Sequence, residues 1–573
     1  MDTSTMPKSP EVAYFSMEIA LDPAVPTYSG GLGVLAGDTL RAGADLGLAM
    51  VGVTLVHRRG YFRQKLDRDG NQTEETSSWN PEQRAEPSDA RASVTIEGRS
   101  VQVRAWRWWI QGMSGFRLPV LLLDTDLPGN SEWDRRLTDH LYGGDSHYRM
   151  CQEVVLGIGG VRILASMGYS DIRTFHMNEG HSALLSLALL EQRIGTNLGL
   201  ATQEDLETVR RQCVFTTHTP VPAGHDQFSR DEMRKVLGPE RAAVLDVTHC
   251  CPDHTLNMTF LALQFSRYVN GVAMQHGDIS QDMFPRYPIH SITNGVHAAT
   301  WTSPAFQSLF DHHLPEWRRD NLYLRYAIKI PVEQIQTAHA ESKRQLLAEV
   351  EKRTGCALKE HAFTIGFARR AATYKRTDLL FSNLDRLRWI TKHIGPLQIV
   401  YGGKAHPKDD AGKALIRRVI EAGAQLSGDV SVAYVEDYDL KWGALMTAGV
   451  DLWLNTPQRP YEASGTSGMK AALSGVPSLS VLDGWWIEGC LEGVTGWAIG
   501  HGGETSEDSA SEAASMYDKL ETLIAPMFYG RPSAYGEVMR HAIAINGAFF
   551  NTHRMLSQYV TQAYERRADR ASS

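Results

Sequence analysis

The sequence of 573 residues lacks a long hydrophobic run and an excess of basic charge. No uninterrupted apolar stretch is long enough to cross a bilayer, so we do not expect a membrane protein. The 58 basic residues are outnumbered by 66 acidic ones, and the formal net charge is -8. A nucleic-acid-binding protein needs a concentrated basic face, so this class is not expected either. Residues 1–10 lack the apolar core of a secretory signal, and we predict a cytoplasmic protein.

Cysteine is also scarce, with six residues at positions 151, 213, 250, 251, 356 and 490. These positions show neither the paired short spacings of a zinc site nor the density of a disulfide scaffold. We therefore expect reduced thiols and no metal site. The adjacent pair Cys250 and Cys251 leaves redox chemistry open as an alternative. No internal repeat or low-complexity linker interrupts the chain.

What the sequence does contain is a regular alternation of short apolar runs and helical patterns in its second half. We predict buried strands at residues 363–367, 397–401, 430–434, 451–454 and 478–482. Helical patterns such as 413–424 lie between them. Strands that alternate with helices indicate a parallel sheet covered on both faces. The second half is therefore predicted to be Rossmann-like.

The first half shows the same alternation of strands and helices, together with an antiparallel hairpin. A predicted strand at 12–16 leads into the glycine turn at 30–33 and a helical stretch, and residues 93–105 predict a hairpin. Further predicted elements are strands at 118–123 and 214–217 and helices at 151–167, 182–194 and 539–566.

These elements together predict an α/β protein of GT-B architecture, in which two Rossmann-like lobes enclose a cleft. Ligands of such sheets bind beyond the carboxyl ends of the strands. We predict an N-terminal lobe at 1–310 that carries the β-hairpin and a C-terminal lobe at 311–535. A helical region at 536–573 is expected to pack back toward the N-terminal lobe.

A glycine-rich loop in the second half ends in a single lysine one turn into a predicted helix. The run is Glu462-Ala463-Ser464-Gly465-Thr466-Ser467-Gly468-Met469-Lys470, and it follows an apolar stretch at 450–454. Small residues let the backbone approach an anion, and the amide groups of a helix start can bind its oxygens. Thr466 and Lys470 share one helix face.

This layout suits a covalently held pyridoxal phosphate, because it sets a phosphate clamp beside an amine. The alternative is an ordinary glycine-rich turn that opens a helix, with Lys470 solvated on its surface.

A second group of charged residues follows the strand predicted at 363–367. Arg369, Arg370, Lys375 and Arg376 place four cations within eight residues. Taken alone, such a run is usually a solvated basic segment. Beside a cofactor phosphate, the same run could hold a second phosphate group, because two phosphate groups brought close together need several fixed positive charges.

Together these segments resemble the α-1,4-glucan phosphorylases, in their short bacterial and archaeal form. The loop at 462–470 matches the cofactor lysine motif of that family nearly letter for letter, and the likeness extends from Tyr14 to the last helical region. The resemblance implies phosphorolysis of terminal glucosyl units of glycogen or maltodextrin by inorganic phosphate, with α-D-glucose 1-phosphate as the product and retention at the anomeric carbon. It implies pyridoxal 5'-phosphate bound to Lys470 and leaves homo-oligomer formation open.

The resemblance also implies a role for each matching residue. Those expected to take part in catalysis are Lys470, Arg370, Lys375 and His218, the last through its backbone carbonyl. Those expected to bind the cofactor are Lys470, Thr466, Ser467, Gly468, Arg369 and Tyr438. Those expected to bind glucan or phosphate are Gly31, Leu32, Asn294, Tyr374, Glu462, Ser464 and Gly465.

Several positions depart from the family pattern. The long animal and bacterial enzymes have lysine where Arg369 stands, and histidine and glutamate where Ala372 and Thr373 stand. Gln458 and Tyr461 replace an arginine and a leucine expected in the short branch. We expect the charge at Arg369 to preserve its role, whereas the other changes bear on sugar contacts and acceptor choice.

Two other functions remain open at this point. A glucan synthase that uses a nucleotide sugar shares the GT-B architecture, but it has no need of a phosphate-clamped Lys470. A glucan-binding relative without catalysis is the other alternative. The family's asparagine on a gate loop has no clear counterpart, and Asp145 is the nearest polar candidate.

Overall fold

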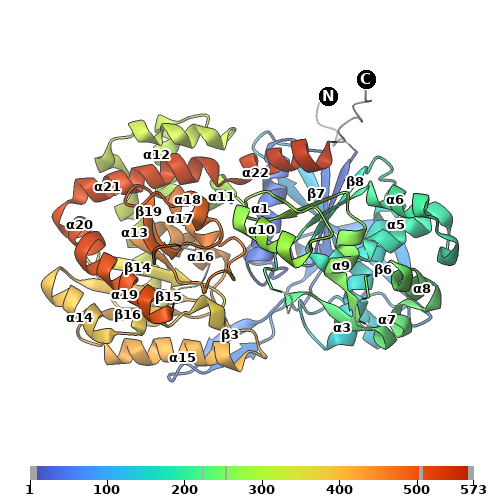
Figure 1. Cartoon of the computed structure of the whole chain (residues 1–573), viewed down its shortest axis with the longest axis horizontal. Helices are drawn as coiled ribbons and strands as arrows, with labels where there is room; N and C mark the ends of the chain where they lie inside the picture. The colour runs from blue at the N-terminus through green and yellow to red at the C-terminus, as the bar shows by residue number, and fades with distance from the viewer. Residues whose placement is uncertain (1–8, 222–223, 249, 252–254, 503–507, 566–573) are drawn as a thin grey trace.

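The computed structural model describes residues 9–221, 224–248, 250–251, 255–502 and 508–565. Residues 566–573 of the predicted C-terminal region and the first eight residues lie outside this range. Two sheets, one in each half of the chain, organise the protein (Figure 1). Among the described residues, no helix has both the length and the apolar character needed to cross a membrane.

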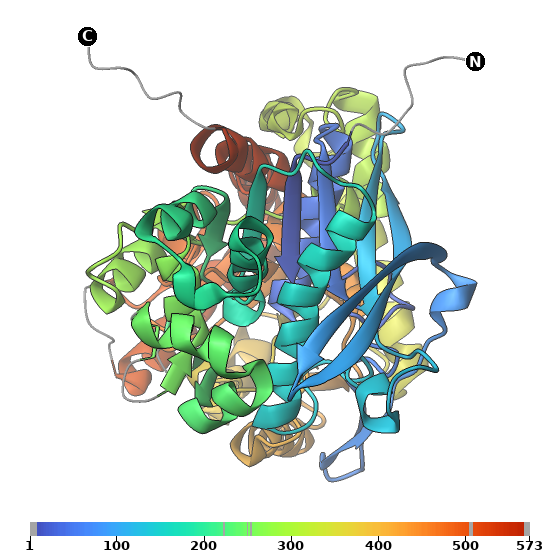
Figure 2. The same ribbon diagram turned by 90° about the vertical axis from the view of Figure 1, so that its right-hand side faces the viewer.

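The first sheet has nine strands in the order β13-β12-β9-β8-β1-β2-β7-β6-β5. The strands are β1 Val12–Ser16, β2 Met50–Leu55, β5 Glu86–Ile96, β6 Arg99–Gln111, β7 Arg117–Asp124, β8 Thr174–Asn178, β9 Cys213–Thr216, β12 Tyr268–Gly271 and β13 His290–Ser291. The pairs from β13 to β7 are parallel, whereas β6 is antiparallel to both β7 and β5. Figure 2 shows this half from its outer side, with helices in front of the blue strands.

The second sheet has six parallel strands in the order β16-β15-β14-β17-β18-β19. The strands are β14 Phe363–Ala368, β15 Leu397–Gly402, β16 Ser431–Val435, β17 Leu452–Asn455, β18 Ser478–Val481 and β19 Gly496–Ile499. In chain order this is 3-2-1-4-5-6, the arrangement of a doubly wound sheet. The parallel strands β1, β2, β7, β8, β9 and β12 follow the same order in the first sheet. The predicted α/β class is confirmed.

Helices cover both sheets, which is why most strand positions are buried. In the first half the main helices are α1 Gly31–Asp45, α3 Ser146–Val154, α4 Gly160–Ser166, α5 Leu185–Ile194, α6 Gln203–Arg210, α7 Arg230–Leu237, α8 Pro239–Val247, α9 Met258–Gln264 and α10 Met274–Met283. In the second half they are α11 Ala298–Trp301, α12 Pro304–His313, α13 Val332–Thr354, α14 Leu384–His393, α15 Asp410–Gln425, α16 Leu440–Gly449, α17 Ser467–Leu473, α18 Trp486–Gly489, α19 Ser509–Lys519, α20 Ala525–Gly530 and α21 Pro532–His541.

The last helix, α22 (Thr552–Tyr559), returns to the first half and packs on α1 (Figure 1). The Tyr559 hydroxyl lies 3.1 Å from Thr216 Oγ1 and 3.0 Å from Asn270 Nδ2. The Tyr564 hydroxyl lies 2.7 Å from Nδ1 of His176 in β8. Residues 559–564 are therefore bonded to the first sheet. The expected domain boundaries at residues 310 and 535 fall inside α12 and α21.

A small hairpin of the first half reaches the second. It consists of β3 (Arg63–Leu66) and β4 (Gln72–Glu75). The Gln64 side chain donates to the Gly403 carbonyl at 3.0 Å, and the Gln72 side chain donates to the Ala405 carbonyl at 2.9 Å. Both acceptors follow the carboxyl end of β15, so the hairpin bonds one half to the strand ends of the other.

Candidate active site

Lys470 lies in α17, the helix that follows β17, and its side chain is buried. Its Nζ atom lies 3.6 Å from the centre of the Trp301 ring. Burial lowers the pKa of the Lys470 amine to about 8, against the smaller opposing effect of Asp38. A buried lysine with a lowered pKa carries a larger unprotonated fraction near neutral pH, and the unprotonated amine is the nucleophilic form.

Trp301 and Asp38 form the surroundings of this amine. Asp38 lies in α1, and its Oδ2 atom accepts a hydrogen bond from Trp301 Nε1 at 2.6 Å and from the His297 amide at 3.1 Å. The Asp38 side chain is 1% exposed, so this bond joins two buried groups. Asp38 thereby fixes the indole ring over the lysine and links α1 of the first half to the Lys470 helix.

A buried carboxylate beside the same loop bridges two cations. Glu462 forms ion pairs with Arg369, at 2.7 Å from Nη2, and with Lys375. Burial alone would raise the pKa of the Glu462 carboxyl, but Arg369 and Lys375 hold it below its usual value. The Glu462 amide donates to Asp483 Oδ2 at 2.9 Å, and burial raises the pKa of the Asp483 carboxyl to about 7. The side chains of Glu462, Arg369 and Lys375 thus form one buried cluster.

Two expected site residues in this cluster and loop have a buried polar atom without a hydrogen-bond partner in the described part of the chain, Nη1 of Arg369 and Oγ of Ser464. Oδ1 of Asn294, which follows β13, is another such atom. Buried polar groups are normally hydrogen-bonded, because leaving one unpaired costs about 1–3 kcal/mol. The unpaired donors and acceptors are therefore suited to a polar ligand.

The glycine turn before α1 lies beside the cationic segment. A β-carbon on Gly30 would lie 3.3 Å from Arg370 Nη2, whereas one on Gly31 would meet nothing within 4 Å. Gly31 and Leu32 open α1, and Arg370 is exposed. The structure thus brings Arg370 to the amide groups at the start of a 15-residue helix, a combination that favours an anion.

Glu18, a buried residue just after β1, shapes this turn. Its Oε2 atom accepts the amide protons of Ser29 at 2.5 Å and Gly30 at 3.1 Å, and its Oε1 atom accepts the Tyr142 hydroxyl at 3.0 Å. A β-carbon on Gly33 would lie 2.7 Å from the same carboxylate. The Glu18 carboxylate thus binds the amides of Ser29 and Gly30, the two residues that precede α1.

His218 follows β9 at the carboxyl edge of the first sheet. Its Nε2 atom lies 2.7 Å from Asn178 Oδ1, and its amide donates to Glu179 Oε2 at 2.9 Å. Burial lowers the pKa of His218 to about 4, so the imidazole is neutral at pH 7. The partners fix both the ring and the backbone of this residue.

Two tyrosines lie on the carboxyl edge of the second sheet. The Tyr438 ring packs on Gly402, at the end of β15. A β-carbon added to this glycine would lie 3.0 Å from the ring. Tyr374 lies next to Lys375, whose Nζ is 4.5 Å from its ring centre, and its ring meets that of Tyr461 edge-on at 6.5 Å. Tyr461 is 38% exposed, so this aromatic pair borders solvent.

The remaining loop residues set the position of α17. Gly465 has a φ of +85°, which favours glycine, and a β-carbon on Gly468 would lie 2.7 Å from the Trp485 ring. Thr466 caps the helix without a side-chain hydrogen bond, and Ser467 Oγ accepts from Trp453 Nε1 at 3.0 Å. The glycines are therefore required by backbone shape and close packing.

Two expected residues have other partners in the structure. Arg376 donates to the carbonyls of Thr456 at 2.9 Å and Pro457 at 2.7 Å and pairs with Glu512, so it holds the loop after β17. Asp145 caps α3, where it accepts the Tyr148 amide at 2.9 Å.

Comparison with known proteins decides the family. The family model described as carbohydrate phosphorylase matches residues 238–524, half of the chain. The chain belongs to the carbohydrate phosphorylase family.

Relatives named as phosphorylases match nearly the whole chain. A maltodextrin phosphorylase of Thermococcus litoralis is 38% identical over 97% of this chain and 70% of its own length. A glycogen phosphorylase of Mycobacterium tuberculosis is 36% identical over 96% of this chain and 70% of its own length. A glycogen phosphorylase of Aquifex aeolicus is 32% identical over 97% of this chain and 86% of its own length.

Sequence reasoning missed three residues of this carbohydrate phosphorylase family site: Glu18, Asp38 and Trp301. The sequence does give a reason to single out Asp38, because it is an acidic residue in the middle of the largely apolar segment 32–44. Nothing local to Trp301 connects it with Lys470, which lies 169 positions later. Their contact depends on the packing of α1, α11 and α17.

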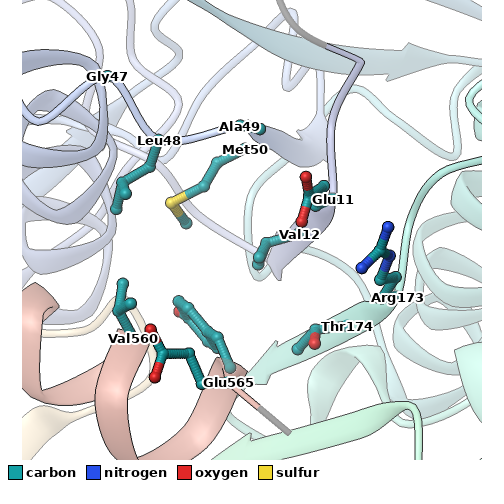
Figure 3. Close-up of a pocket in the computed structure, with 11 residues that line it drawn as sticks. Glu11, Val12, Gly47, Leu48, Ala49, Met50, Arg173, Thr174, Val560 and Glu565 are labelled. Carbon is teal, nitrogen blue, oxygen red and sulfur yellow. The ribbon is translucent and has the colours of Figure 1, made fainter.

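A separate cavity lies at the opposite edge of the first sheet. It has a volume of about 570 Å³ and is lined by the amino ends of β1, β2 and β8 together with Val560, Tyr564 and Glu565 (Figure 3). None of the expected site residues of this carbohydrate phosphorylase family member lines it. This cavity is therefore not the candidate active site, whose side chains lie at the carboxyl edges of the two sheets.

Proposed function

We propose that the chain is an α-1,4-glucan phosphorylase. It would cleave terminal α-1,4-glucosyl units of glycogen or maltodextrin with inorganic phosphate and release α-D-glucose 1-phosphate with retention. One observation carries the proposal: buried Lys470 and the Arg369–Glu462–Lys375 cluster follow the neighbouring strands β14 and β17. Family membership and the names of the relatives support it.

We assign pyridoxal 5'-phosphate to Lys470, and the residues present fit this group. The amine is buried with a lowered pKa, and Nη1 of Arg369 is an unpaired donor. When bound, the cofactor supplies a phosphate that acts as an acid–base group beside the substrate phosphate. Its proposed contacts are with Thr466, Ser467, Gly468, Arg369 and Tyr438.

Inorganic phosphate would bind between the two halves of the chain. Arg370 and Lys375 supply positive charge, and the amides of Gly31 and Leu32 supply donors at the start of α1. Glu462 already neutralises part of the charge of Lys375. The cations therefore hold a dianion without leaving a large uncompensated charge when phosphate departs.

The terminal glucosyl unit would lie beside this phosphate. We propose that Glu462, Ser464, Gly465, Asn294 and Tyr374 contact its hydroxyl groups. The unpaired atoms of Ser464 and Asn294 support this role, since each can bond a sugar hydroxyl. The carbonyl of His218 would face the anomeric carbon and stabilise the positive charge that develops there.

The reaction then exchanges one bond for another on the same face of the sugar. The bond between the anomeric carbon and the glycosidic oxygen breaks, and the departing oxygen takes a proton from the substrate phosphate. A phosphate oxygen then bonds to the same carbon, which conserves atoms and retains the configuration. Arg370 and Lys375 hold the phosphate throughout, so a pair of catalytic carboxylates is not required.

The two sheets support the proposal of a GT-B architecture with the active site in a cleft between lobes at 1–310 and 311–535. The helical region from 536 onward would join the lobes, in line with the packing of α22 on α1. Homo-oligomer formation and a cytoplasmic location stay predictions.

An assay with two substrate pairs tests the function. The purified holoenzyme is incubated with maltodextrin and phosphate, or with a nucleotide glucose and a glucan primer. We expect glucose 1-phosphate from the first pair and no elongation from the second. Product from the nucleotide sugar alone would contradict the proposal in favour of a synthase.

A second experiment tests the lysine. Borohydride reduction followed by peptide mapping should place a pyridoxyl group on Lys470, and Lys470→Ala should reduce phosphorolysis to background. Lys441→Ala is the matched control, because Lys441 lies on the exposed surface of α16. Full activity of Lys470→Ala would exclude the proposed attachment.

A further inference from the structure

A group of three metal-ligand side chains lies outside the candidate active site. Asp45 ends α1, His297 precedes α11 and His553 lies in α22. Their ligand atoms all lie within 4.8 Å of one another, and each side chain is at most 8% exposed. Residues distant in sequence thus converge on one buried point.

Both imidazole rings of the group direct their Nε2 atoms at the same carboxylate oxygen. Nε2 of His297 lies 2.8 Å from Asp45 Oδ2, and Nε2 of His553 lies 3.2 Å from the same oxygen. Ligands of a tetrahedral zinc ion with bonds near 2.0–2.1 Å are separated by roughly 3.3 Å. A small outward movement of the side chains would therefore admit an ion between them.

Two of the three side chains have a partner that would orient them as metal ligands. Asp45 Oδ1 accepts the Met113 amide at 2.8 Å, so that Oδ2 is the oxygen that faces the two histidines. Nδ1 of His297 lies 2.7 Å from Thr300 Oγ1, and a partner of this kind orients a metal-binding imidazole. Nδ1 of His553 has no partner within the described part of the chain.

The backbone holds the two histidines in place before any ion binds. The Val296 amide donates to the Phe550 carbonyl at 3.1 Å, and the Thr552 amide donates to the Val296 carbonyl at 3.0 Å. A β-carbon on Gly295 would lie 2.2 Å from the Asn551 carbonyl oxygen, so the two segments are pressed together. The site is preorganised on the histidine side.

We infer that Asp45, His297 and His553 form a structural site for one zinc ion, with a water molecule as the fourth ligand. Two imidazoles favour zinc over the calcium and magnesium ions that prefer oxygen ligands. This inference departs from our expectation from the sequence that the protein has no metal site. It does not depend on the proposed function.

The place of the ion indicates what it does. Asp45 lies at the far end of α1 from Gly31, about 20 Å along a helix that rises 1.5 Å per residue. The ion would therefore not touch the substrate phosphate that we propose to bind at Gly31. It would fasten α22 to α1 and to the segment that carries Trp301, since one ligand comes from each.

Metal analysis of the holoenzyme tests the inference. The protein is produced without a histidine tag, saturated with zinc, passed through a desalting column and analysed by mass spectrometry for metals. We expect about one zinc per chain, which is lost in His553→Gln. His361→Gln is the matched control, because His361 is exposed and far in sequence from the group.

A second measurement does not depend on a variant that folds. A strong chelator should lower the thermal unfolding temperature of the wild-type holoenzyme, and added zinc should restore it. The same treatment should leave His553→Gln unchanged. Wild-type protein without bound zinc after saturation, or His553→Gln with full zinc content, would overturn the assignment and leave a purely hydrogen-bonded triad.

Discussion

At the scale of single residues, the site depends on burial that the sequence does not reveal. The motif at 462–470 predicts the lysine, yet its amine lies against Trp301 and its pKa is affected by burial and by Asp38, which belong to other elements. The same holds for Glu462, whose two cations come from the segment after β14. Local sequence predicts which residues are reactive, whereas the folded chain determines their charge and partners.

The pKa of Lys470 gives a pH dependence that can be measured on protein stripped of cofactor. The amine reacts only when unprotonated, so a pKa lowered to about 8 moves its reactivity down from the usual value near 10.4. We expect the rate of cofactor uptake to rise with pH, with a midpoint near 8, and then to level off. Absorbance changes after rapid mixing would measure it. A midpoint above pH 10 would contradict the effect of burial.

Removal of the Glu462 charge should impair both binding and stability. Glu462→Gln leaves Arg369 and Lys375 without their shared anion and would weaken the proposed bond to the sugar. Hydrogen bonds to charged groups contribute about 1.5–3 kcal/mol, so we expect kcat/KM to fall by about 10- to 150-fold. Steady-state kinetics with maltodextrin would measure the loss. Glu351→Gln, at an exposed position of α13, should change little.

At the scale of elements, apolar runs in the sequence predict most of the parallel strands, but not all of them. The runs that became β14, β15 and β18 are fully buried, whereas β2 (Met50–Leu55), which is apolar and equally buried, is not among the predicted strands. β8 escaped prediction because His176 and Asn178 are polar, although both are buried through hydrogen bonds. β19 is only four residues long and begins with glycine.

A buried ion-pair group illustrates how elements of the second half are joined. Asp451, before β17, accepts Lys343 Nζ of α13 at 2.6 Å, His339 Nε2 at 3.0 Å and the Thr364 amide at 2.7 Å. These partners outweigh the burial that would otherwise raise the pKa of the Asp451 carboxyl, and they hold it below its usual value.

Asp451→Asn should therefore destabilise the protein strongly. The substitution leaves the Lys343 charge buried and unpaired, and removal of one partner of a buried pair costs about 3–5 kcal/mol. Denaturant unfolding followed by tryptophan fluorescence would measure the change in unfolding free energy. Asp385→Asn is the control, since the Asp385 side chain is 90% exposed and should contribute about 0–1 kcal/mol. Equal effects of the two variants would contradict the role of Asp451.

At the scale of the whole molecule, the chain crosses between its halves and returns. The first sheet ends at β13, the second occupies 363–499, and α22 then packs on α1. The sequence predicted a helical region at the end of the chain but not the tyrosines that attach it. Such contacts join residues more than 250 positions apart, and no local pattern encodes them.

Removal of the two tyrosine hydroxyls should loosen this attachment. In the double variant Tyr559→Phe and Tyr564→Phe, buried groups of β8, β9 and β12 lose their partners. Each buried group left unpaired costs about 1–3 kcal/mol. We expect a lower thermal unfolding temperature and faster amide exchange in β9 and β12. Tyr323→Phe, which removes an exposed hydroxyl, is the control, and equal exchange in both proteins would contradict the prediction.

The return of α22 also has a consequence for the order in which the protein is made. On the ribosome the first sheet emerges early, and domains begin to fold during synthesis. The tyrosines that bond to β8, β9 and β12 are translated only after the whole second sheet. The half of the chain that is made first is therefore completed only when α22 has been made, and a nascent chain has to keep that surface from aggregating until then.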